Sequence, residues 1–281
     1  MYEILAKENL APVTKLFEVR APAVAQKARA GQFVIVRLTE EGERIPLTIA
    51  DYDRQRGTIT LVVQEVGKTT MEMGLMVAGD HFASFTGPLG IPSEVENFGT
   101  VLCVGGGVGI APIYPIARDL KEAGNKVISI IGARNKDLLF WEDKMRAISD
   151  ELIVCTDDGS YGRKALVTIP MKEMLEAGRP IDRIWAIGPA IMMKFCALTA
   201  KPFGVHMEVS LNSIMVDGTG MCGACRVEVG GQTRFVCVDG PEFDGYQVDW
   251  DQLLARQRIY LEQEQEATAK WDHDCRCGEQ G

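Results

Sequence analysis

Short apolar runs that recur at strand length characterise residues 1–90. Glycines between the runs, at positions 31, 42, 57 and 67, mark the turns. The runs lie at Tyr2–Leu5, Leu16–Val19, Gln32–Leu38, Pro46–Ala50 and Thr58–Val66. Runs of this length and spacing predict a small antiparallel barrel or sandwich, with one short helix at Thr70–Val77.

From residue 100 the pattern changes to buried-type strands that alternate with amphipathic helices. The expected strands are Val101–Val104, Lys126–Ile131, Leu152–Thr156, Arg183–Ile187 and His206–Leu211. The expected helices are Ala111–Ala123, Asp137–Ile148, Thr168–Ala177 and Ala190–Ala200. This alternation predicts a doubly wound parallel sheet with helices on both faces.

After Asn212 the alternation stops, and a glycine-rich stretch with three cysteines begins. It is too short to form a core of its own, so we expect a bound metal to hold it together. A polar helix is predicted at Asp249–Trp271. The predicted division is therefore a barrel over 1–98, an α/β domain over 99–212, a cysteine section over 213–248 and a terminal helix and tail over 249–281.

The cysteine section offers four candidate metal ligands, which are Asp217, Cys222, Cys225 and Cys237. Glycines at 218, 220 and 223 allow the backbone to fold tightly between them. Sulfur-rich, loop-borne sites with four ligands suit either zinc or an iron–sulfur cluster. The spacing by itself leaves both metals open.

The composition and charge of the chain favour some classes of protein and disfavour others. The chain has 281 residues, 46% of them hydrophobic, which suggests two domains or slightly more. The net charge of -9 argues against a nucleic-acid partner. No apolar run reaches the length of a membrane span, and the N-terminus lacks the apolar core of a signal peptide. Eight cysteines, three of them in one site, favour a reducing cytoplasm.

Three glycine-containing or acidic turns lie at the carboxyl ends of predicted strands, where ligands bind in such sheets. Gly105–Gly109 joins the first strand to the first helix and is a candidate pyrophosphate cradle, although a tight packing turn explains it equally well. Thr156–Ser160 contains Asp157 and Asp158, and Gly188-Pro189 follows the fourth strand; ordinary turn chemistry also accounts for both. Arg134 stands where an acidic ribose ligand is expected, which leaves NADP open.

Four motifs occur in a characteristic order: Arg44-Ile-Pro-Leu-Thr48, Gly67-Lys-Thr-Thr70, the Gly105–Gly109 turn and Gly188-Pro189. Together they resemble the ferredoxin–NADP reductase superfamily. The cysteine section narrows the resemblance to electron-transfer subunits that carry FAD and a 2Fe-2S cluster. Within these, dihydroorotate dehydrogenase electron-transfer subunits place a cysteine where Asp217 stands. The small subunits of electron-bifurcating NADH-dependent ferredoxin:NADP oxidoreductase carry aspartate there, so this chain resembles them more closely.

The resemblance implies roles for individual residues. Asp217, Cys222, Cys225 and Cys237 are expected to bind the 2Fe-2S cluster, Arg44 an FAD phosphate, and Thr48 to face the flavin N5 edge. No residue is expected to act as a general acid or base. Many superfamily members have a cysteine before the late Gly-Pro turn, whereas this chain has Ile187. The expected cofactor-binding residues are Arg44, Pro46, Leu47, Thr48, Val62, Gln64, Gly67, Thr69, Thr70, Gly105, Gly106, Gly107, Val108, Gly109, Asp157, Asp158, Gly188 and Pro189.

The implied function is electron transfer between NAD(H), FAD and the cluster. The implied partner is a larger flavoprotein subunit with its own FAD and 4Fe-4S clusters, and ferredoxin is reached only through that partner. Two alternatives stay open, an electron-transfer subunit of dihydroorotate dehydrogenase and a nucleotide-binding module with structural zinc. Cys103, Cys155 and Cys196 are expected only to pack in the core, and Cys275 and Cys277 to be tail thiols.

Overall fold

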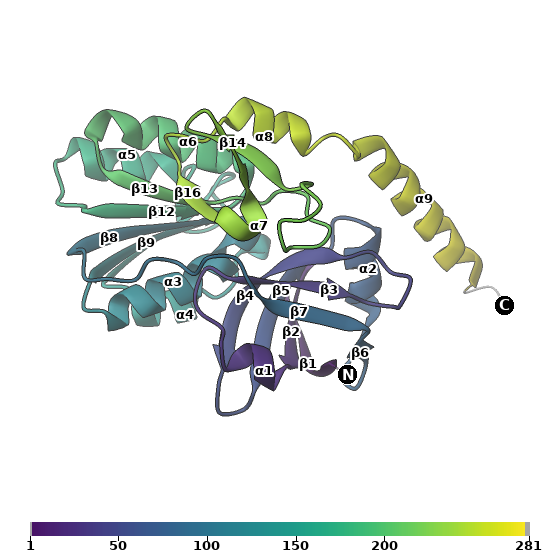
Figure 1. Cartoon of the computed structure of the whole chain (residues 1–281). Coiled ribbons are helices and arrows are strands. Elements are labelled where there is room, and N and C mark those ends of the chain that lie inside the picture. Colours follow the sequence, from purple (N-terminus) through teal and green to yellow (C-terminus); the bar gives the residue numbers. More distant parts are fainter. Residues whose placement is uncertain (1, 279–281) are drawn as a thin grey trace.

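Two seven-stranded sheets make up most of the chain in the computed structural model (Figure 1). The structure describes residues 2–278, with side chains described as far as Trp271. The thiols of Cys275 and Cys277 lie outside the described side chains, so their expected role stays a prediction.

The first sheet is antiparallel and nearly closed. Its order is β6-β1-β2-β5-β4-β3-β7, and its two edge strands are separated in the chain by Ala83 alone, so the edges meet. The predicted barrel is therefore confirmed, with Phe17, Ile49 and Leu61 fully buried inside it. Its strands are β1 (Tyr2–Ala11), β2 (Thr14–Arg20), β3 (Phe33–Arg37), β4 (Ile45–Asp53), β5 (Thr58–Gln64), β6 (His81–Phe82) and β7 (Ser84–Leu89).

Two short helices, α1 (Pro22–Ala25) and α2 (Lys68–Leu75), lie on the connections of the barrel. The prediction placed the start of α2 at Thr70, but Gly67 is its N-cap. The reason is a hydrogen bond that the Gly67 N–H donates to Thr70 Oγ1 at 3.0 Å. This contact satisfies one of the amides that a helix start leaves unpaired.

The second sheet is the predicted doubly wound α/β sheet, in the order β11-β10-β9-β8-β12-β13-β16. All its pairs are parallel except the last one, because β16 runs antiparallel to β13. The strands are β8 (Thr100–Gly106), β9 (Lys126–Ala133), β10 (Glu151–Thr156), β11 (Arg163–Lys164), β12 (Arg183–Ile187), β13 (His206–Ser210) and β16 (Glu242–Asp244).

Helices cover both faces of this sheet, as expected. Residues of α3 (Ile110–Glu122) and α4 (Glu142–Ile148) share one hydrophobic cluster, and residues of α5 (Thr168–Glu176) and α6 (Ala190–Ala200) share the other. The prediction that a helix begins at Asp137 was wrong. Lys136–Leu138 forms a short 3-10 turn, η2, and Trp141 has a positive φ of 57° that breaks the helical backbone before Glu142. Two further 3-10 turns are η1 (Gly107–Gly109) and η3 (Lys201–Phe203).

The cysteine section consists of a loop, a hairpin and a short helix. The hairpin pairs β14 (Arg226–Val229) with β15 (Gln232–Phe235), and α7 (Val236–Asp239) follows with Cys237 in it. The section then contributes β16 to the α/β sheet. Three residues with two carboxylates gave no strand signal in the sequence, so this attachment was missed.

The single terminal helix that the sequence predicted is in fact two helices. They are α8 (Trp250–Arg256) and α9 (Leu261–Gly278), separated by a turn at 257–260. The Asp249 side chain caps α8 by accepting from the Gln252 N–H at 2.9 Å. Figure 1 shows α9 running away from the sheets, and it contacts α2 of the barrel. None of the described helices combines the length and apolarity that a membrane span needs.

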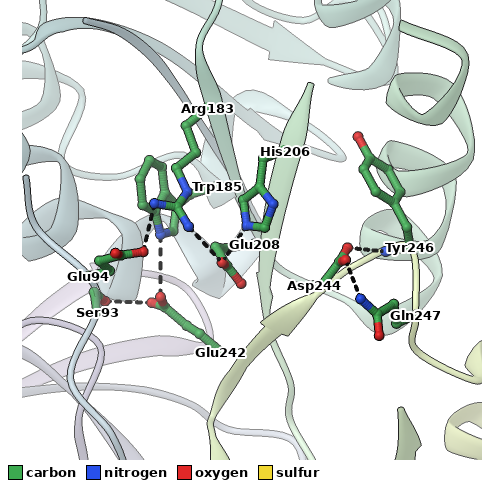
Figure 2. Close-up of polar contacts among 10 residues, drawn as sticks. All are labelled: Ser93, Glu94, Arg183, Trp185, His206, Glu208, Glu242, Asp244, Tyr246 and Gln247. Atoms are coloured by element: carbon green, nitrogen blue, oxygen red, sulfur yellow. Dashed lines mark hydrogen bonds and ion pairs between the residues drawn. The ribbon is translucent and has the colours of Figure 1, made fainter. Parts of the chain in front are cut away.

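A partly buried polar contact joins the parts of the chain (Figure 2). Glu242 of β16 accepts hydrogen bonds from Ser93 Oγ at 2.5 Å and from Trp185 Nε1 at 3.3 Å. Ser93 lies in the segment between the two sheets, and Trp185 lies in β12. Burial raises the pKa of Glu242 to about 7. The cysteine section is therefore held both to the linker and to the α/β sheet.

Candidate functional site

A cleft of about 940 Å³ lies between the barrel and the carboxyl edge of the α/β sheet. Barrel residues Thr48 and Gln64 face it from β4 and β5, and Gly107 faces it from the turn after β8. The cleft therefore brings predicted flavin residues and predicted nicotinamide-nucleotide residues into one space. Of the predicted set, its lining includes Pro46, Thr48, Gln64, Gly106, Gly107, Val108, Gly109, Asp157, Gly188 and Pro189.

The two glycine turns of the α/β sheet pack against each other. A Cβ on Gly109 would lie 2.2 Å from the Ile187 carbonyl oxygen, and one on Gly188 would lie 2.9 Å from the Gly106 carbonyl oxygen. Gly107 is different, because its φ is +55° and no heavy atom lies within 4 Å of the position of a Cβ. Glycine at 109 thus allows the two turns to pack closely, while the backbone of Gly107 is open to a ligand at the start of α3. The turn fits a dinucleotide pyrophosphate.

Several predicted barrel residues do not reach the cleft lining. Arg44 is exposed, and neither it nor Leu47 is part of the lining. Val62 is buried and packs in the hydrophobic cluster that includes Ala50 and α3. Val62 therefore packs between the barrel and the α/β domain. Its role in cofactor binding stays a prediction. Gly105 and Asp158 also lie outside the lining.

The start of α2 is a second open position, away from the cleft lining. No heavy atom lies within 4 Å of a Cβ built on Gly67. Thr70 Oγ1 donates to the Gly67 carbonyl oxygen at 2.9 Å, and Thr69 Oγ1 donates to Glu43 Oε2 at 2.6 Å. Both hydroxyls thus have partners within the chain. An FAD pyrophosphate here would take its amide contacts from the backbone at Gly67 and would replace the Thr69–Glu43 bond.

The carboxyl ends of β9 and β10 carry charges of opposite sign. Arg134 follows β9 and Asp157 follows β10, and both line the cleft. Burial raises the pKa of Asp157, and the neighbouring Asp158 raises it further. The side chain of Asp158 accepts from Ser160 Oγ at 2.7 Å and from the Ser160 N–H at 2.9 Å. These bonds lower the pKa of Asp158 and keep it charged.

The four predicted cluster ligands lie in two close pairs. Cys222 Sγ donates to Asp217 Oδ1 at 3.1 Å, and Cys225 Sγ donates to Cys237 Sγ at 3.2 Å. Hydrogen bonds from Cys222 and Thr219 lower the pKa of Asp217 to about 2. Within the described part of the chain, no three histidine, cysteine or acidic side chains converge on a single ion position. Two pairs fit a centre with two irons, whereas one zinc ion would require all four donors to converge.

Glycine is required in the loop that carries these ligands. Gly218, Gly220 and Gly223 all have a positive φ, between 66° and 81°. A Cβ on Gly218 would also lie 2.8 Å from side-chain carbons of Ile35 and of Leu89, which belong to β3 and β7. The cluster loop therefore lies directly against the barrel.

Sequence reasoning missed two features of the site. Four residues separate Asp217 from Cys222, and two separate Cys222 from Cys225, which is the spacing of plant-type 2Fe-2S proteins with aspartate at the first position. That signal was readable. The second feature is Met192 of α6, which lines the cleft against Gly106. Phe33, Phe195 and Ser213 also line it, and no pattern in the sequence connects them.

Comparison with known proteins agrees with this arrangement. Residues 212–249 match the model of the iron–sulfur cluster binding domain of dihydroorotate dehydrogenase B. The chain is 56% identical to a dihydroorotate dehydrogenase B (NAD(+)) electron transfer subunit homolog from Thermotoga maritima, over 93% of this chain and 92% of that protein. It is 33% identical to the electron transfer subunit of that enzyme from Desulforamulus reducens, over 89% of this chain and 97% of that protein.

Among solved structures, a chain of the NADH-dependent reduced ferredoxin-NADP oxidoreductase, described in work on flavin-based electron bifurcation, is 54% identical. The match has a TM-score of 0.91 and covers 96% of this chain and 98% of that chain. The chain belongs to the family of electron-transfer subunits that comprises those of dihydroorotate dehydrogenase B and their homologues.

Proposed function

We propose that this protein is an electron-transfer flavoprotein subunit that passes electrons between NAD(H), FAD and a 2Fe-2S cluster within an electron-bifurcating NADH-dependent ferredoxin:NADP oxidoreductase. The observation that carries this proposal is the shared cleft. It places Thr48 and Gln64 of the barrel opposite the open backbone of Gly107, while the cluster loop packs on the same barrel.

The residues of this chain bind and position the cofactors. Bound flavin accepts two electrons at once as a hydride and can release them one at a time, whereas the cluster carries one electron at a time. Gly107 and the start of α3 hold the pyrophosphate of the nicotinamide nucleotide, and Gly188-Pro189 completes that wall. Thr48 offers a hydroxyl toward the flavin edge from the middle of β4. The apolar walls supplied by Phe33, Ile187 and Met192 exclude water around the reacting rings.

Asp217 supports the choice between the two neighbouring families. It stands in the position of the first ligand and lies beside Cys222. The relative whose structure is described as a ferredoxin-NADP oxidoreductase matches 96% of this chain, whereas the subunit from Desulforamulus reducens matches 89% of it. A carboxylate oxygen is a harder and weaker electron donor than a thiolate of the same charge, so the cluster potential depends on which ligand stands at this position.

The homologues are electron-transfer subunits, which implies a partner subunit for this chain. We infer that the partner is a larger flavoprotein with FAD and 4Fe-4S clusters, and that ferredoxin is reached only through it. The outer edge of the cluster loop supports a docking partner here. Cys222 is exposed, and the neighbouring Met221 is 88% exposed. Val216 of the same loop is exposed as well, and neighbouring exposed apolar side chains are typical of a contact surface.

NADH is the preferred nucleotide in this proposal. Asp157 and Asp158 bring negative charge to the ends of the strands where the adenosine ribose binds, and a 2′-phosphate would meet that charge. Arg134 at the same edge would favour the 2′-phosphate, but Asp157 lies close enough to be influenced by its charge. The two carboxylates of Asp157 and Asp158 therefore repel a 2′-phosphate more strongly than Arg134 attracts it, which favours NADH.

Purification of the native complex tests the proposal. The tagged chain should copurify with a larger flavoprotein subunit, and the complex should contain FAD, acid-labile sulfide and more iron than one 2Fe-2S cluster supplies. It should also reduce a small artificial acceptor with NADH. Copurification with a dihydroorotate-oxidising subunit would support the first alternative instead. A colourless preparation with stoichiometric zinc and no flavin would support the structural-zinc alternative.

A further inference from the structure

The C-terminal arm, defined here as the turn 257–260 and residues 261–271 of α9, whose side chains are described, has little contact with the rest of the chain. Eight of its α9 side chains are exposed, and only Ala267, Thr268 and Trp271 are partly covered. Those three follow the spacing of one helix face, and the helix contacts α2. A helix with so little packing draws most of its stability from elsewhere. The arm therefore leaves most of its surface exposed to solvent in the isolated chain.

The base of the arm is fixed to the cluster loop. Arg256 Nη2 donates to the carbonyl oxygen of Ala224, between Cys222 and Cys225, at 3.0 Å. Gln257 Nε2 donates to the backbone carbonyl oxygen of Asn212 at 2.7 Å, and Asn212 lines the cleft. The arm thus leaves the body of the protein directly beside the redox centre, in a fixed direction.

Apolar side chains are exposed on both sides of this junction. Ile259 and Tyr260 are each 51% exposed in the turn, and Leu261 follows at the start of α9. Val216 and Met221 are exposed on the cluster loop, which the Arg256–Ala224 bond ties to the same junction. Clustered apolar exposure of this kind marks a protein contact surface, whereas isolated exposed residues need no explanation. Both sets of exposed side chains belong to segments that the Arg256–Ala224 hydrogen bond holds together.

The exposed face of α9 is acidic. Glu262 and Glu266 lie one turn apart on it, and Lys270 lies one turn beyond them on the same side. Glu264 points to another side of the helix, and Arg258 lies in the preceding turn. A partner surface that receives this face is expected to present Lys or Arg side chains around an apolar centre, because complementary charge steers docking and fixes its register.

The length of the relatives agrees with a separate role for this segment. The electron transfer subunit from Desulforamulus reducens aligns over 97% of its own length but leaves 11% of this chain unmatched. The cluster-binding family model ends at residue 249, and 32 residues follow it (281 minus 249). The ferredoxin-NADP oxidoreductase chain, in contrast, covers 96% of this chain.

We propose that the C-terminal arm is the docking element for the larger partner subunit, in which a basic groove receives the acidic face of α9 and an apolar patch covers Ile259, Tyr260 and Leu261. This inference rests on the proposed function, since it takes its partner from there. Beyond that function, it identifies the segment of this chain that binds the partner and states that the partner surface is basic with an apolar patch.

Two variants of the full complex test the arm, each coexpressed with the partner subunit. The first ends at residue 260, so it keeps the Arg256 and Gln257 contacts with the cluster loop and the cleft. The second is E262K/E266K, which reverses the acidic face. The matched control is E122K/E176K, two exposed glutamates of α3 and α5, which lie on the side of the molecule away from α9 (Figure 1).

Both arm variants are expected to bind the partner at least about tenfold more weakly than the wild-type chain, measured by analytical ultracentrifugation of the mixed subunits. The control is expected to bind like the wild type. All four proteins should retain the same flavin and cluster absorbance, and the same rate of NADH-dependent reduction of a small acceptor by the isolated chain. A wild-type affinity in both arm variants would overturn the docking role. So would a wild-type chain that dimerises by itself while the arm variants are monomers, because a second copy would then be the occupant.

These outcomes are distinguishable from a failure of the proposed function. A wild-type chain without flavin, or one that copurifies with a dihydroorotate-oxidising subunit, contradicts the proposed function before any variant is made. Arm variants that keep the flavoprotein partner contradict the arm alone.

Discussion

Replacement of Glu242 by glutamine tests how the cysteine section is held to the two sheets. The carboxyl group accepts from Ser93 and Trp185, and Arg183 and Glu208 lie close enough to influence its charge (Figure 2). Desolvation is the largest cause of its raised pKa, and the charge of Glu208 raises it further. The hydrogen bonds from Ser93 and Trp185 and the charge of Arg183 lower it. The other titratable groups of this region are Glu94, Cys103, His206 and Asp244.

The direction of the pH effect follows from the raised pKa. The folded chain keeps the Glu242 proton up to about pH 7, whereas the unfolded chain loses it near 4.5. The stability that this group contributes is therefore complete below pH 4.5 and is lost as the pH rises through 7. The difference of about 2.5 pH units corresponds to on the order of 3 kcal/mol. This figure is an upper bound, because the residue retains some exposure to solvent.

Glutamine stays neutral at every pH, while its oxygen still accepts from Trp185 and its amide donates to Ser93. The Tm of E242Q minus the Tm of the wild-type holoprotein is therefore expected to rise between pH 5.5 and pH 8.5. Because pH 5.5 already lies about one unit above 4.5, about 1.5 of the 2.5 units are lost over this range, which is about 2 kcal/mol. At roughly 2 °C per kcal/mol, the rise is at most about 4 °C. Differential scanning calorimetry at one scan rate measures it, and the difference between variants cancels the effect of pH on all other groups. An equal Tm difference at the two pH values would refute the role of the buried charge.

Four further results are expected. Asp217→Cys should keep the cluster but shift its midpoint potential and its electron paramagnetic resonance spectrum; unchanged values of both would contradict a ligand role for Asp217. Cys225→Ala should lose the cluster absorbance and acid-labile sulfide while flavin remains, and full retention of iron would remove Cys225 from the ligand set. Gly109→Ala should slow flavin reduction by NADH by about tenfold or more, or about 1.4 kcal/mol, because the added Cβ would lie 2.2 Å from a carbonyl oxygen. D157N/D158N should raise kcat/KM for NADPH relative to NADH by about tenfold, about 1.4 kcal/mol, and an unchanged ratio would exclude the acidic pair as the source of selectivity.

Local sequence patterns were sufficient to predict most of the strands and helices. The strand Arg183–Ile187 and the helix Ala190–Ala200 have the predicted bounds, because an apolar run after Arg183 and a helix after Gly-Pro are strong local signals. The antiparallel barrel followed from runs punctuated by glycine. Where the prediction failed, tertiary contacts decided the outcome. The three residues of β16 form a strand only because β13 offers them an edge, and α8 ends where Gln257 turns back to Asn212.

The site was predictable to the extent that its residues lie in one motif. Asp217, Cys222 and Cys225 are close in the sequence, so the motif marked them as ligands of one metal centre, but the choice of a 2Fe-2S cluster over zinc came from the family resemblance. The cleft is different, since Phe33, Ile187 and Ser213 meet only through the packing of three segments. The same holds for Glu242 and Ser93, which are 149 residues apart in the chain. No local pattern can reveal a contact of that kind.

Anaerobic titration of the isolated chain, with NADH and NADPH in separate experiments, tests the central claim most directly. The flavin absorbance should bleach rapidly with NADH, and the electron paramagnetic resonance signal of a reduced 2Fe-2S cluster should develop in the same sample. Rapid bleaching by NADPH alone would contradict the nucleotide assignment. A protein that shows no flavin absorbance and no cluster signal with either nucleotide would contradict the electron-transfer function itself.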